Sequence, residues 1–482
     1  NSAVRALEPN SLWNHFADLN AVPRPSKHEE RVIEFAKSFG ESLGLETLVD
    51  QAGNVLIRKP ATAGMENRKP IVMQSHLDMV HQKNRDTEFD FAVQGIEMEI
   101  DGDWVTAKGT TLGADNGIGV ATIMAILSSD EIEHPALEAL FTIDEETGMT
   151  GAKELQGNWM QGEILLNLDT EEDNELTIGC AGGVDVSADL AYALEPVGES
   201  VTAYQVSIRG LVGGHSGMDI HLGRGNANKI MNRLLYVAAK SGARIASIDG
   251  GSLRNAIPRE STAIFVVPNG TDMGWFEKEQ QELIAENRLT DPELEIVCEP
   301  VDLPDGLIPM ALQTSLLAAL FGITNGIVRM SPSISDLVQT SNNLARVLVK
   351  DGKLRIDCLT RSSVDSERAD LARSLGAVLE ITGAELDIDG DYPGWEPQPD
   401  SDIVQMMKAL YEERFGEPPH VAACHAGLEC GLLGKNYPDM EMISFGPTIR
   451  GAHSPDEKVS ISSVKKYWPF VLETLKRIPV KK

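Results

Sequence analysis

Three short apolar segments in the first part of the chain each end directly in a histidine or in acidic residues. They are the segment 70–74, which runs into Ser75-His76-Leu77-Asp78, the segment 137–143, which runs into Asp144-Glu145-Glu146, and the segment 163–168, which runs into Asp169. Each has the length and composition of a buried strand. Because parallel strands joined by helices bring their carboxyl ends to one edge of a sheet, the pattern predicts an α/β fold. We expect a mostly parallel sheet, flanked by helices, whose edge carries a site.

Two helix starts can be located beside these strands. Ser26-Lys27-His28-Glu29 has the form of an S-x-x-E capping box, and apolar residues at helical spacing follow it. We therefore expect a helix that begins directly after Ser26. The glycine-rich run 109–119 opens a second helix, which ends near residue 127.

The length of 482 residues exceeds what one hydrophobic core usually organises, so two domains are expected. Near residue 186 the pattern changes to strands and helices typical of a separate α+β unit, and from about residue 400 the strand-then-helix pattern returns. The sequence predicts one domain built from residues 1–186 and 398–482, with an α+β domain, residues 187–397, inserted into it.

The charge of the chain excludes some classes of partner. Asp and Glu number 73 against 42 Lys and Arg, a formal charge of −31 that repels phosphate backbones and anionic lipid surfaces. We expect no nucleic-acid partner and no membrane association. An apolar leader and a run of about 20 apolar residues are both missing. Together with five scattered cysteines, an odd number, this favours a cytoplasmic protein in a reducing compartment.

The polar residues after the first strand have the spacing of a metal site. A pair of metal ions needs a bridging carboxylate, about two further ligands for each metal, and a nearby base. His76 could bind a metal while Asp78 accepts the hydrogen bond of the other ring nitrogen. Asp115 stands among glycines, where little bulk obstructs a metal, and is a candidate bridge. A sequence of this kind is otherwise often an ordinary turn.

The remaining candidates follow the other strands. Adjacent acidic side chains point in different directions, so one residue of the run at 144–146 could bind metal while its neighbour serves as base. Such a run, like Asp169 beside Glu171 and Glu172, can also be a solvated surface. His453 lies in a loop between a strand and the last helix, where a single histidine is usually a surface residue. The occurrence of all these groups at strand ends or loops of one sheet favours a site.

Four motifs carry a resemblance to a known family. They are Ser75-His76-Leu77-Asp78-Met79, Gly113-Ala114-Asp115-Asn116-Gly117, Asp144-Glu145-Glu146-Thr147-Gly148 and Gly451-Ala452-His453-Ser454-Pro455. The chain resembles the two-zinc exopeptidases that include carboxypeptidase G, the aminoacylases and carnosinase, and is most similar to their aminoacyl-histidine dipeptidase branch. The resemblance implies a zinc-exopeptidase fold in which residues 1–186 and 398–482 are catalytic and residues 187–397 form a lid.

The resemblance also implies a role for each candidate. His76 and Asp169 would bind one Zn²⁺, Glu146 and His453 the other, and Asp115 would bridge them, with Co²⁺ or Mn²⁺ as alternative metals. Asp78 would orient His76, and Glu145 would be the general base. In the lid, His215 would stabilise the oxyanion, and substrate contacts would come from Asn255, Arg361 and Gly427. His425 and His81 receive no role.

The substrates implied are unblocked dipeptides of broad sequence, including Xaa-His peptides such as carnosine. A homodimer through the lid is also implied, with His215 acting in its own chain or in a neighbouring subunit. Two alternatives stay open: the same zinc chemistry on N-acyl amino acids, tripeptides or carboxyl-terminal residues, and a non-catalytic metal-binding scaffold. A nucleotide site in the run 109–119 is excluded, because it lacks both the Gly-Lys-Ser/Thr ending and the G-x-G-x-x-G pattern.

Overall fold

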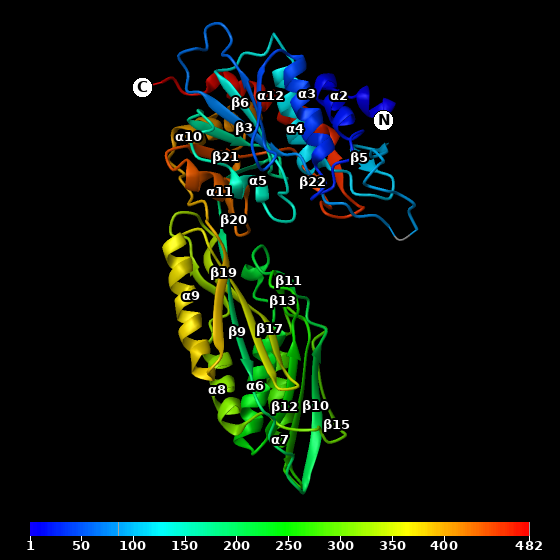
Figure 1. Ribbon diagram of the computed structural model, residues 1–482, viewed down its shortest axis with the longest axis vertical. Coiled ribbons are helices and arrows are strands. Elements are labelled where there is room, and N and C mark those ends of the chain that lie inside the picture. Colours follow the sequence, from blue (N-terminus) through cyan, green and yellow to red (C-terminus); the bar gives the residue numbers. More distant parts are fainter. Residues whose placement is uncertain (85, 482) are drawn as a thin grey trace. The chain divides into compact units, whose positions relative to one another are not determined.

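The computed structural model describes residues 1–84 and 86–481, which divide into two compact units (Figure 1). Unit 1 comprises Asn1–Gly179, Pro397–Ala423 and Leu428–Lys482, and unit 2 comprises Cys180–Glu396 and Cys424–Gly427. The short segment Cys424–Gly427 therefore belongs to unit 2, although unit 1 flanks it on both sides in the sequence.

Unit 1 is built on an eight-stranded sheet in the order β1-β2-β6-β3-β7-β21-β8-β20. The parallel centre consists of β6 (Leu137–Thr142), β3 (Ile71–His76), β7 (Ile164–Asn167) and β21 (Glu441–Ser444). Flanking it are β1 (Glu46–Val49), β2 (Val55–Lys59), β8 (Glu175–Cys180) and β20 (His420–Cys424). The expected α/β class is confirmed. Antiparallel pairs join β1 to β2, β2 to β6 and β8 to β21, so the sheet is not parallel throughout.

The register of the central strands brings their carboxyl ends together. His76 at the end of β3 lies opposite Thr142 of β6, and Gln74 lies opposite Asn167 of β7. Because β7 and β21 also run in parallel, Ser444 lies beside Asn167. The residues that follow these strands therefore emerge at one edge.

Helices pack around this sheet. They are α1 (Ser2–Arg5), α2 (Asn10–Leu19), α3 (Glu30–Ser42), α4 (Ala114–Leu127), α5 (Thr150–Glu154), α10 (Asp402–Phe415), α11 (Glu429–Asn436) and α12 (Ile461–Arg477). Helix α4 is apolar on all sides because it packs between β3 and α2 (Figure 1). At Gly119 a Cβ atom would lie 2.4 Å from Ser75 Oγ, so glycine permits this close packing.

The expected capping box is wrong. Helix α3 begins at Glu30, and no side-chain hydrogen bond caps its first turn. Ser26 Oγ instead donates to Asp78 Oδ2 at 2.7 Å, and Glu29 Oε1 accepts from the backbone N–H of Lys27 at 2.8 Å. The Ser26 hydroxyl, which would cap the helix in the local motif, therefore binds a residue 52 positions away in sequence.

A small antiparallel sheet, unforeseen from the sequence, holds the loop of His453. Its strands are β22 (Ile449–Arg450), β23 (Lys458–Ser460), β5 (Trp104–Ala107) and β4 (Met98–Asp101), in that order. The pairing of β23 with β5 ties the end of the chain to the segment before α4.

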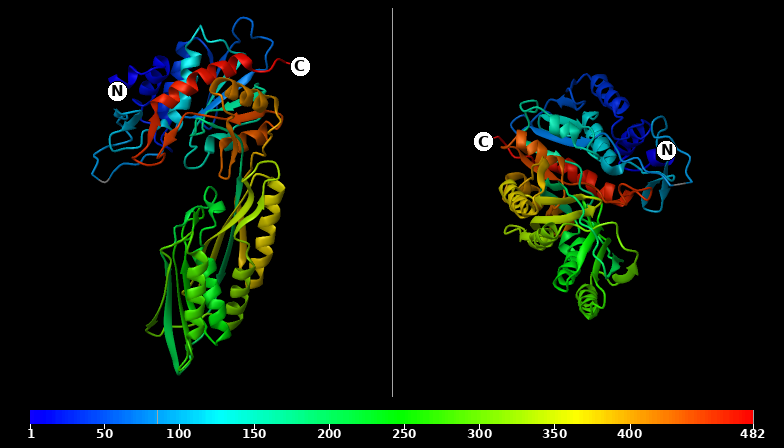
Figure 2. Two further views of the ribbon diagram at one scale, coloured as in Figure 1. Left: turned by 180° about the vertical axis from the view of Figure 1, so that it is seen from behind. Right: turned by 60° about the horizontal axis from the view of Figure 1, so that its bottom comes forward.

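Unit 2 is an antiparallel sheet covered by helices on one face (Figure 2). Its strands are β15 (Glu295–Val301), β10 (Val201–Arg209), β14 (Ser261–Pro268), β12 (Arg244–Gly250), β17 (Val338–Lys350), β18 (Lys353–Ser362), β9 (Gly182–Ala191) and β19 (Glu385–Tyr392), with β16 (Gly326–Met330) paired to β17. Its helices are α6 (Ala227–Lys240), α7 (Gly274–Asn287), α8 (Met310–Gly322) and α9 (Asp365–Leu379). One apolar core joins the helices to the sheet.

Two further observations concern the whole described chain, residues 1–84 and 86–481. Every helix in it falls short of the length and apolarity required to cross a membrane. None of the five cysteines forms a disulfide.

Candidate metal centre

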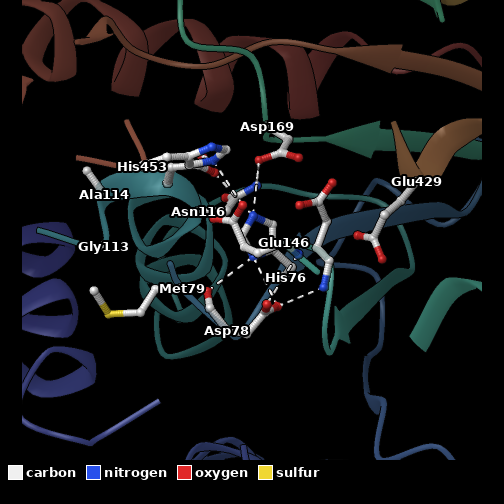
Figure 3. A network of polar contacts seen from close by, with 12 residues as sticks. His76, Asp78, Met79, Gly113, Ala114, Asn116, Glu146, Asp169, Glu429 and His453 are labelled. Carbon is white, nitrogen blue, oxygen red and sulfur yellow. Dashed lines mark hydrogen bonds and ion pairs between the residues drawn. The ribbon is translucent and has the colours of Figure 1, made fainter. Parts of the chain in front are cut away.

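The structure gathers the predicted ligand residues at the carboxyl edge of the unit 1 sheet (Figure 3). His76 is the last residue of β3, and Asp115 lies in the first turn of α4. Glu146 follows β6 and Asp169 follows β7. His453 comes from the loop between β22 and β23. The residues thus arrive from five different parts of the chain.

Asp115 stands between the two imidazoles. Its Oδ1 lies 3.2 Å from His76 Nε2, and its Oδ2 lies 3.2 Å from His453 Nε2. His76 Nε2 also lies 3.6 Å from Asp169 Oδ1, and His453 Nε2 lies 2.9 Å from Glu146 Oε2. Two groups of donor atoms share Asp115: one is completed by His76 and Asp169, the other by Glu146 and His453, and within each group the atoms lie within 4.8 Å of one another. His76 and Glu146 also form such a group with Glu145.

Asp78 holds the ring of His76 from the other side. The distance from His76 Nδ1 to Asp78 Oδ1 is 3.3 Å, which leaves Nε2 facing the carboxylates. Asp78 also accepts the backbone N–H groups of Glu145 at 3.0 Å and Glu146 at 3.3 Å. Burial acts to raise the pKa of Asp78, but the hydrogen bonds from His76, Ser26 and Glu145 outweigh it and lower that pKa.

Burial and the charges of neighbouring carboxylates disfavour ionisation of two acidic side chains at this site. Burial, with the neighbouring Asp115 and Glu146, raises the pKa of Asp169 to about 6. Burial also raises the pKa of Glu145 well above its usual range. Glu146 Oε1 is buried and has no hydrogen-bond partner. Bound cations relieve such crowding, and carboxylate with imidazole is a donor set that suits Zn²⁺, Co²⁺ or Mn²⁺.

A buried polar layer lies directly below these residues and was not foreseen. Glu429, 1% exposed, accepts from Gln74 Nε2 at 2.6 Å and from Thr142 Oγ1 at 2.7 Å. Asn167 Nδ2 donates to Gln74 Oε1 at 2.5 Å. The layer joins the ends of β6, β3 and β7. Its signal in the sequence was the presence of polar residues near the ends of otherwise apolar strands.

Unit 2 contains the other predicted residues. His215 lies in β11 (Gly214–His215), which pairs with β13 (Ala256–Ile257), and Ser216 N–H donates to Asn255 O at 2.8 Å. His215 and Asn255 therefore lie at the same two-stranded antiparallel pair. Gly427 lies apart from it in sequence, in the segment Cys424–Gly427.

Arg361 belongs to β18 and is 4% exposed. Its Nη1 donates to the hydroxyl of Tyr392 at 3.0 Å, which fixes the guanidinium. On the neighbouring strand, Ser341 lies opposite Arg361, and Ser341 Oγ lies 2.8 Å from His425 Nε2. His425, which sequence reasoning left without a role, therefore belongs to the surroundings of Arg361.

The hydrogen bonds of His215 decide its tautomer. Its Nδ1 accepts the backbone N–H groups of Gly217 at 3.1 Å and Met218 at 3.0 Å. The proton of the neutral ring is therefore on Nε2. Burial and the charge of Arg361 lower the pKa of His215, so the ring is neutral at neutral pH. Its Nε2–H is available as a hydrogen-bond donor.

His425 makes the stability of unit 2 depend on pH. Burial first, then the charges of Arg361, His215 and His221, lower the pKa of His425 to about 3, against 6.5 for the unfolded chain. As pH falls below 6.5, His425 becomes protonated in the unfolded chain but stays neutral in the folded unit. The free energy of unfolding therefore falls. We expect a loss of about 2 kcal/mol at pH 5 from this residue. Urea unfolding at pH 7.5 and pH 5 would show a smaller loss in His425→Gln; equal losses in both proteins would contradict it.

Comparison with known proteins assigns the family. The model of peptidase family M20/M25/M40 matches residues 72–477. The chain is 43% identical over 484 residues to the cytosol non-specific dipeptidase of Escherichia coli, covering 100% of both chains. It is also 43% identical to the crystal structure of aminoacylhistidine dipeptidase from Vibrio alginolyticus, with a TM-score of 0.94 and 99% of each chain covered. An aminopeptidase from Bacillus cereus shares the fold, with a TM-score of 0.58 at 16% identity, covering 98% of this chain and 99% of that one. The chain belongs to peptidase family M20/M25/M40.

Proposed function

We propose that this chain is a metal-dependent dipeptidase that hydrolyses unblocked dipeptides of broad sequence, including Xaa-His peptides such as carnosine. The observation that carries the proposal is the position of Asp115, whose two carboxylate oxygens each face a different imidazole. The full-length similarity to two proteins named as dipeptidases supports the substrate class.

The proposed centre holds two Zn²⁺ ions. His76 and Asp169 would hold the first, Glu146 and His453 would hold the second, and Asp115 would contribute to both, which the two groups of donor atoms that share Asp115 support. Co²⁺ or Mn²⁺ would fit the same donors. When bound, such ions lower the pKa of water and polarise the peptide carbonyl.

Glu145 is the proposed general base. It accepts a proton from the attacking water and returns that proton to the amine that leaves. Asp78 supports this role, because it accepts the backbone N–H of Glu145 while it orients the ring of His76. One carboxylate thus positions both a ligand and the base.

Unit 2 would act as the lid and unit 1 as the catalytic domain. The proposed oxyanion donor is the Nε2–H of His215, whose other ring nitrogen, Nδ1, accepts two backbone N–H groups. Arg361, fixed by Tyr392, binds the terminal carboxylate of the substrate. Asn255 and Gly427 provide further substrate contacts.

Loss of Arg361 should separate carboxylate recognition from catalysis. In Arg361→Met we expect KM for a dipeptide to rise about 10- to 100-fold, since a charge-assisted hydrogen bond contributes about 1.5–3 kcal/mol. The same dipeptide with an amidated carboxyl terminus should respond little to the substitution. Steady-state kinetics on both substrates test this, with Tyr392→Phe as the matched control of smaller effect. An equal rise in KM for the amide would remove Arg361 from carboxylate binding.

The substrate class is tested with a panel of free dipeptides, N-acetylated dipeptides and tripeptides. Preference for free dipeptides supports the proposal. Faster cleavage of the acetylated or longer substrates would be consistent with the same metal chemistry. The substrates would then be N-acyl amino acids, tripeptides or carboxyl-terminal residues. Absence of any hydrolysis would favour the metal-binding scaffold.

The proposed location is the cytoplasm, which the name of the Escherichia coli relative and the lack of disulfides support. The proposed assembly is a homodimer through unit 2. Strand β16 supports it, because it exposes Ile327, Val328 and Met330 to between 42% and 45%. Light scattering of the purified protein would decide between dimer and monomer.

A further inference from the structure

A buried carboxylate outside the proposed ligand set connects two of the ligand loops. Glu457 follows His453 by four residues and is 2% exposed. Its Oε2 accepts the backbone N–H groups of Leu112 at 2.7 Å and Gly113 at 2.8 Å. Its Oε1 accepts those of Ala114 at 2.7 Å and Asp115 at 3.1 Å. A residue in the loop of His453 thereby binds the backbone on which Asp115 lies.

These contacts complete the start of α4. The first N–H groups of a helix have no partner within the helix, and that end carries partial positive charge. Gly113, which precedes α4, has no side chain to cap it. Glu457 supplies the missing acceptor from a position more than 340 residues away in sequence.

Arg24 binds the same turn through a carbonyl oxygen, whereas Glu457 binds it through N–H groups. It is 1% exposed, and its Nη2 donates to Gly113 O at 2.6 Å. Its Nη1 donates to the carbonyl oxygens of Leu77 and Asp78, each at 3.0 Å. Gly113 has a φ of +71°, and a Cβ there would lie 2.5 Å from Arg24 Nη2, so the contact requires glycine. Arg24 therefore ties the turn of Asp115 to the turn of His76.

We propose that Glu457 and Arg24 are positioning residues that fix the loops of His76, Asp115 and His453 relative to one another, so that both metal ions are bound tightly. The inference rests on the proposed function. Neither residue is a proposed ligand, and both use their charges on backbone groups. They act on metal affinity through the placement of Asp115, which belongs to both donor groups.

The test is metal binding by Glu457→Gln. The amide keeps the shape of the side chain but places an NH₂ group against backbone N–H donors. We expect its apparent affinity for Zn²⁺ to fall about 10- to 100-fold, as for other outer contacts of metal ligands. Competition of the metal-free protein with a chelator of known affinity gives the dissociation constants. The absorption bands of added Co²⁺ report the coordination geometry. Arg24→Met should shift both readouts in the same direction.

Glu138→Gln is the matched control. Glu138 is 5% exposed, and its Oε2 accepts the backbone N–H groups of Gln161 at 2.6 Å and Gly162 at 2.9 Å. It lies at the start of β6, whereas Glu145 follows the end of that strand. We expect this variant to lower the unfolding midpoint of the metal-free protein and to leave Zn²⁺ affinity within about twofold of wild type.

The outcomes separate this inference from the proposed function. Weaker Zn²⁺ binding and altered Co²⁺ bands in Glu457→Gln, with normal binding in Glu138→Gln, support it. Suppose that the wild type binds two ions and hydrolyses dipeptides. If Glu457→Gln then binds the ions equally tightly, this inference is overturned and the proposed function stands. The inference is also overturned if Glu138→Gln weakens Zn²⁺ binding as much as Glu457→Gln does. A wild type that binds no metal would overturn the proposed function as well.

Discussion

Replacing Glu145 with glutamine is expected to lower kcat for dipeptide hydrolysis about 10³-fold while the protein keeps two metal ions per chain. Glutamine has nearly the same shape but cannot accept the proton of the attacking water. The backbone N–H of Glu145, which Asp78 accepts at 3.0 Å, is unaffected by the change. Elemental analysis and steady-state kinetics on the same preparation test both halves of the prediction.

Glu146→Gln is the informative comparison for that experiment. Glu146 Oε2 lies 2.9 Å from His453 Nε2 and belongs to a donor group, so its loss should remove metal together with activity. Glu145→Asp, which keeps the base on a shorter side chain, should recover part of the rate. The assignment of Glu145 fails if the glutamine variant retains a tenth or more of the wild-type kcat, or if it loses metal as Glu146→Gln does.

Asp115→Ala is expected to abolish binding of both metal ions and to reduce activity by more than about 10³-fold. Its carboxylate is the one member common to the two donor groups, so both ions lose a ligand at once. In His453→Ala, by contrast, only the group of Asp115, Glu146 and His453 loses a ligand. We therefore expect that variant to retain about one ion per chain.

The unfolding midpoint of the metal-free proteins shows whether the effect is local. In the metal-free protein the carboxylate of Asp115 lies within hydrogen-bond distance of His76 and His453, and these contacts lower its pKa although burial acts to raise it, so its removal loses both contacts. We expect the midpoint of metal-free Asp115→Ala to fall by a few degrees for the loss of two hydrogen bonds, whereas a much larger fall would show that the substitution disturbs the whole unit. Retention of two ions by Asp115→Ala would refute a bridging role.

The candidate ligands could be predicted because their signal is local. His76 is the last residue of a short strand, Glu146 and Asp169 each follow a strand within a few residues, and parallel strands bring such ends to one edge. The parallel pairing of β6, β3, β7 and β21 then produced the expected edge. The antiparallel flanks were missed because strands such as β1 and β2 are short and carry no signal of direction.

The residues that support the ligands could not be predicted, because their partners are distant in sequence. Glu457 reads as one acid in a polar loop, yet its partners lie at residues 112–115. Ser26 fits a local capping motif, yet its hydroxyl binds Asp78. Tertiary contacts outweighed local preference in both cases. The role of His425 beside Ser341 likewise depends on a contact across 84 residues.

Whether this chain is a metal-dependent dipeptidase is tested by measuring its metal content together with hydrolysis of a dipeptide panel, before and after treatment with a chelator. We expect two metal ions per chain, hydrolysis of free dipeptides in preference to N-acetylated dipeptides and tripeptides, and loss of hydrolysis on chelation that added Zn²⁺ restores. A protein that binds no metal, or that hydrolyses dipeptides at the same rate after its metal has been removed, would contradict the proposed function.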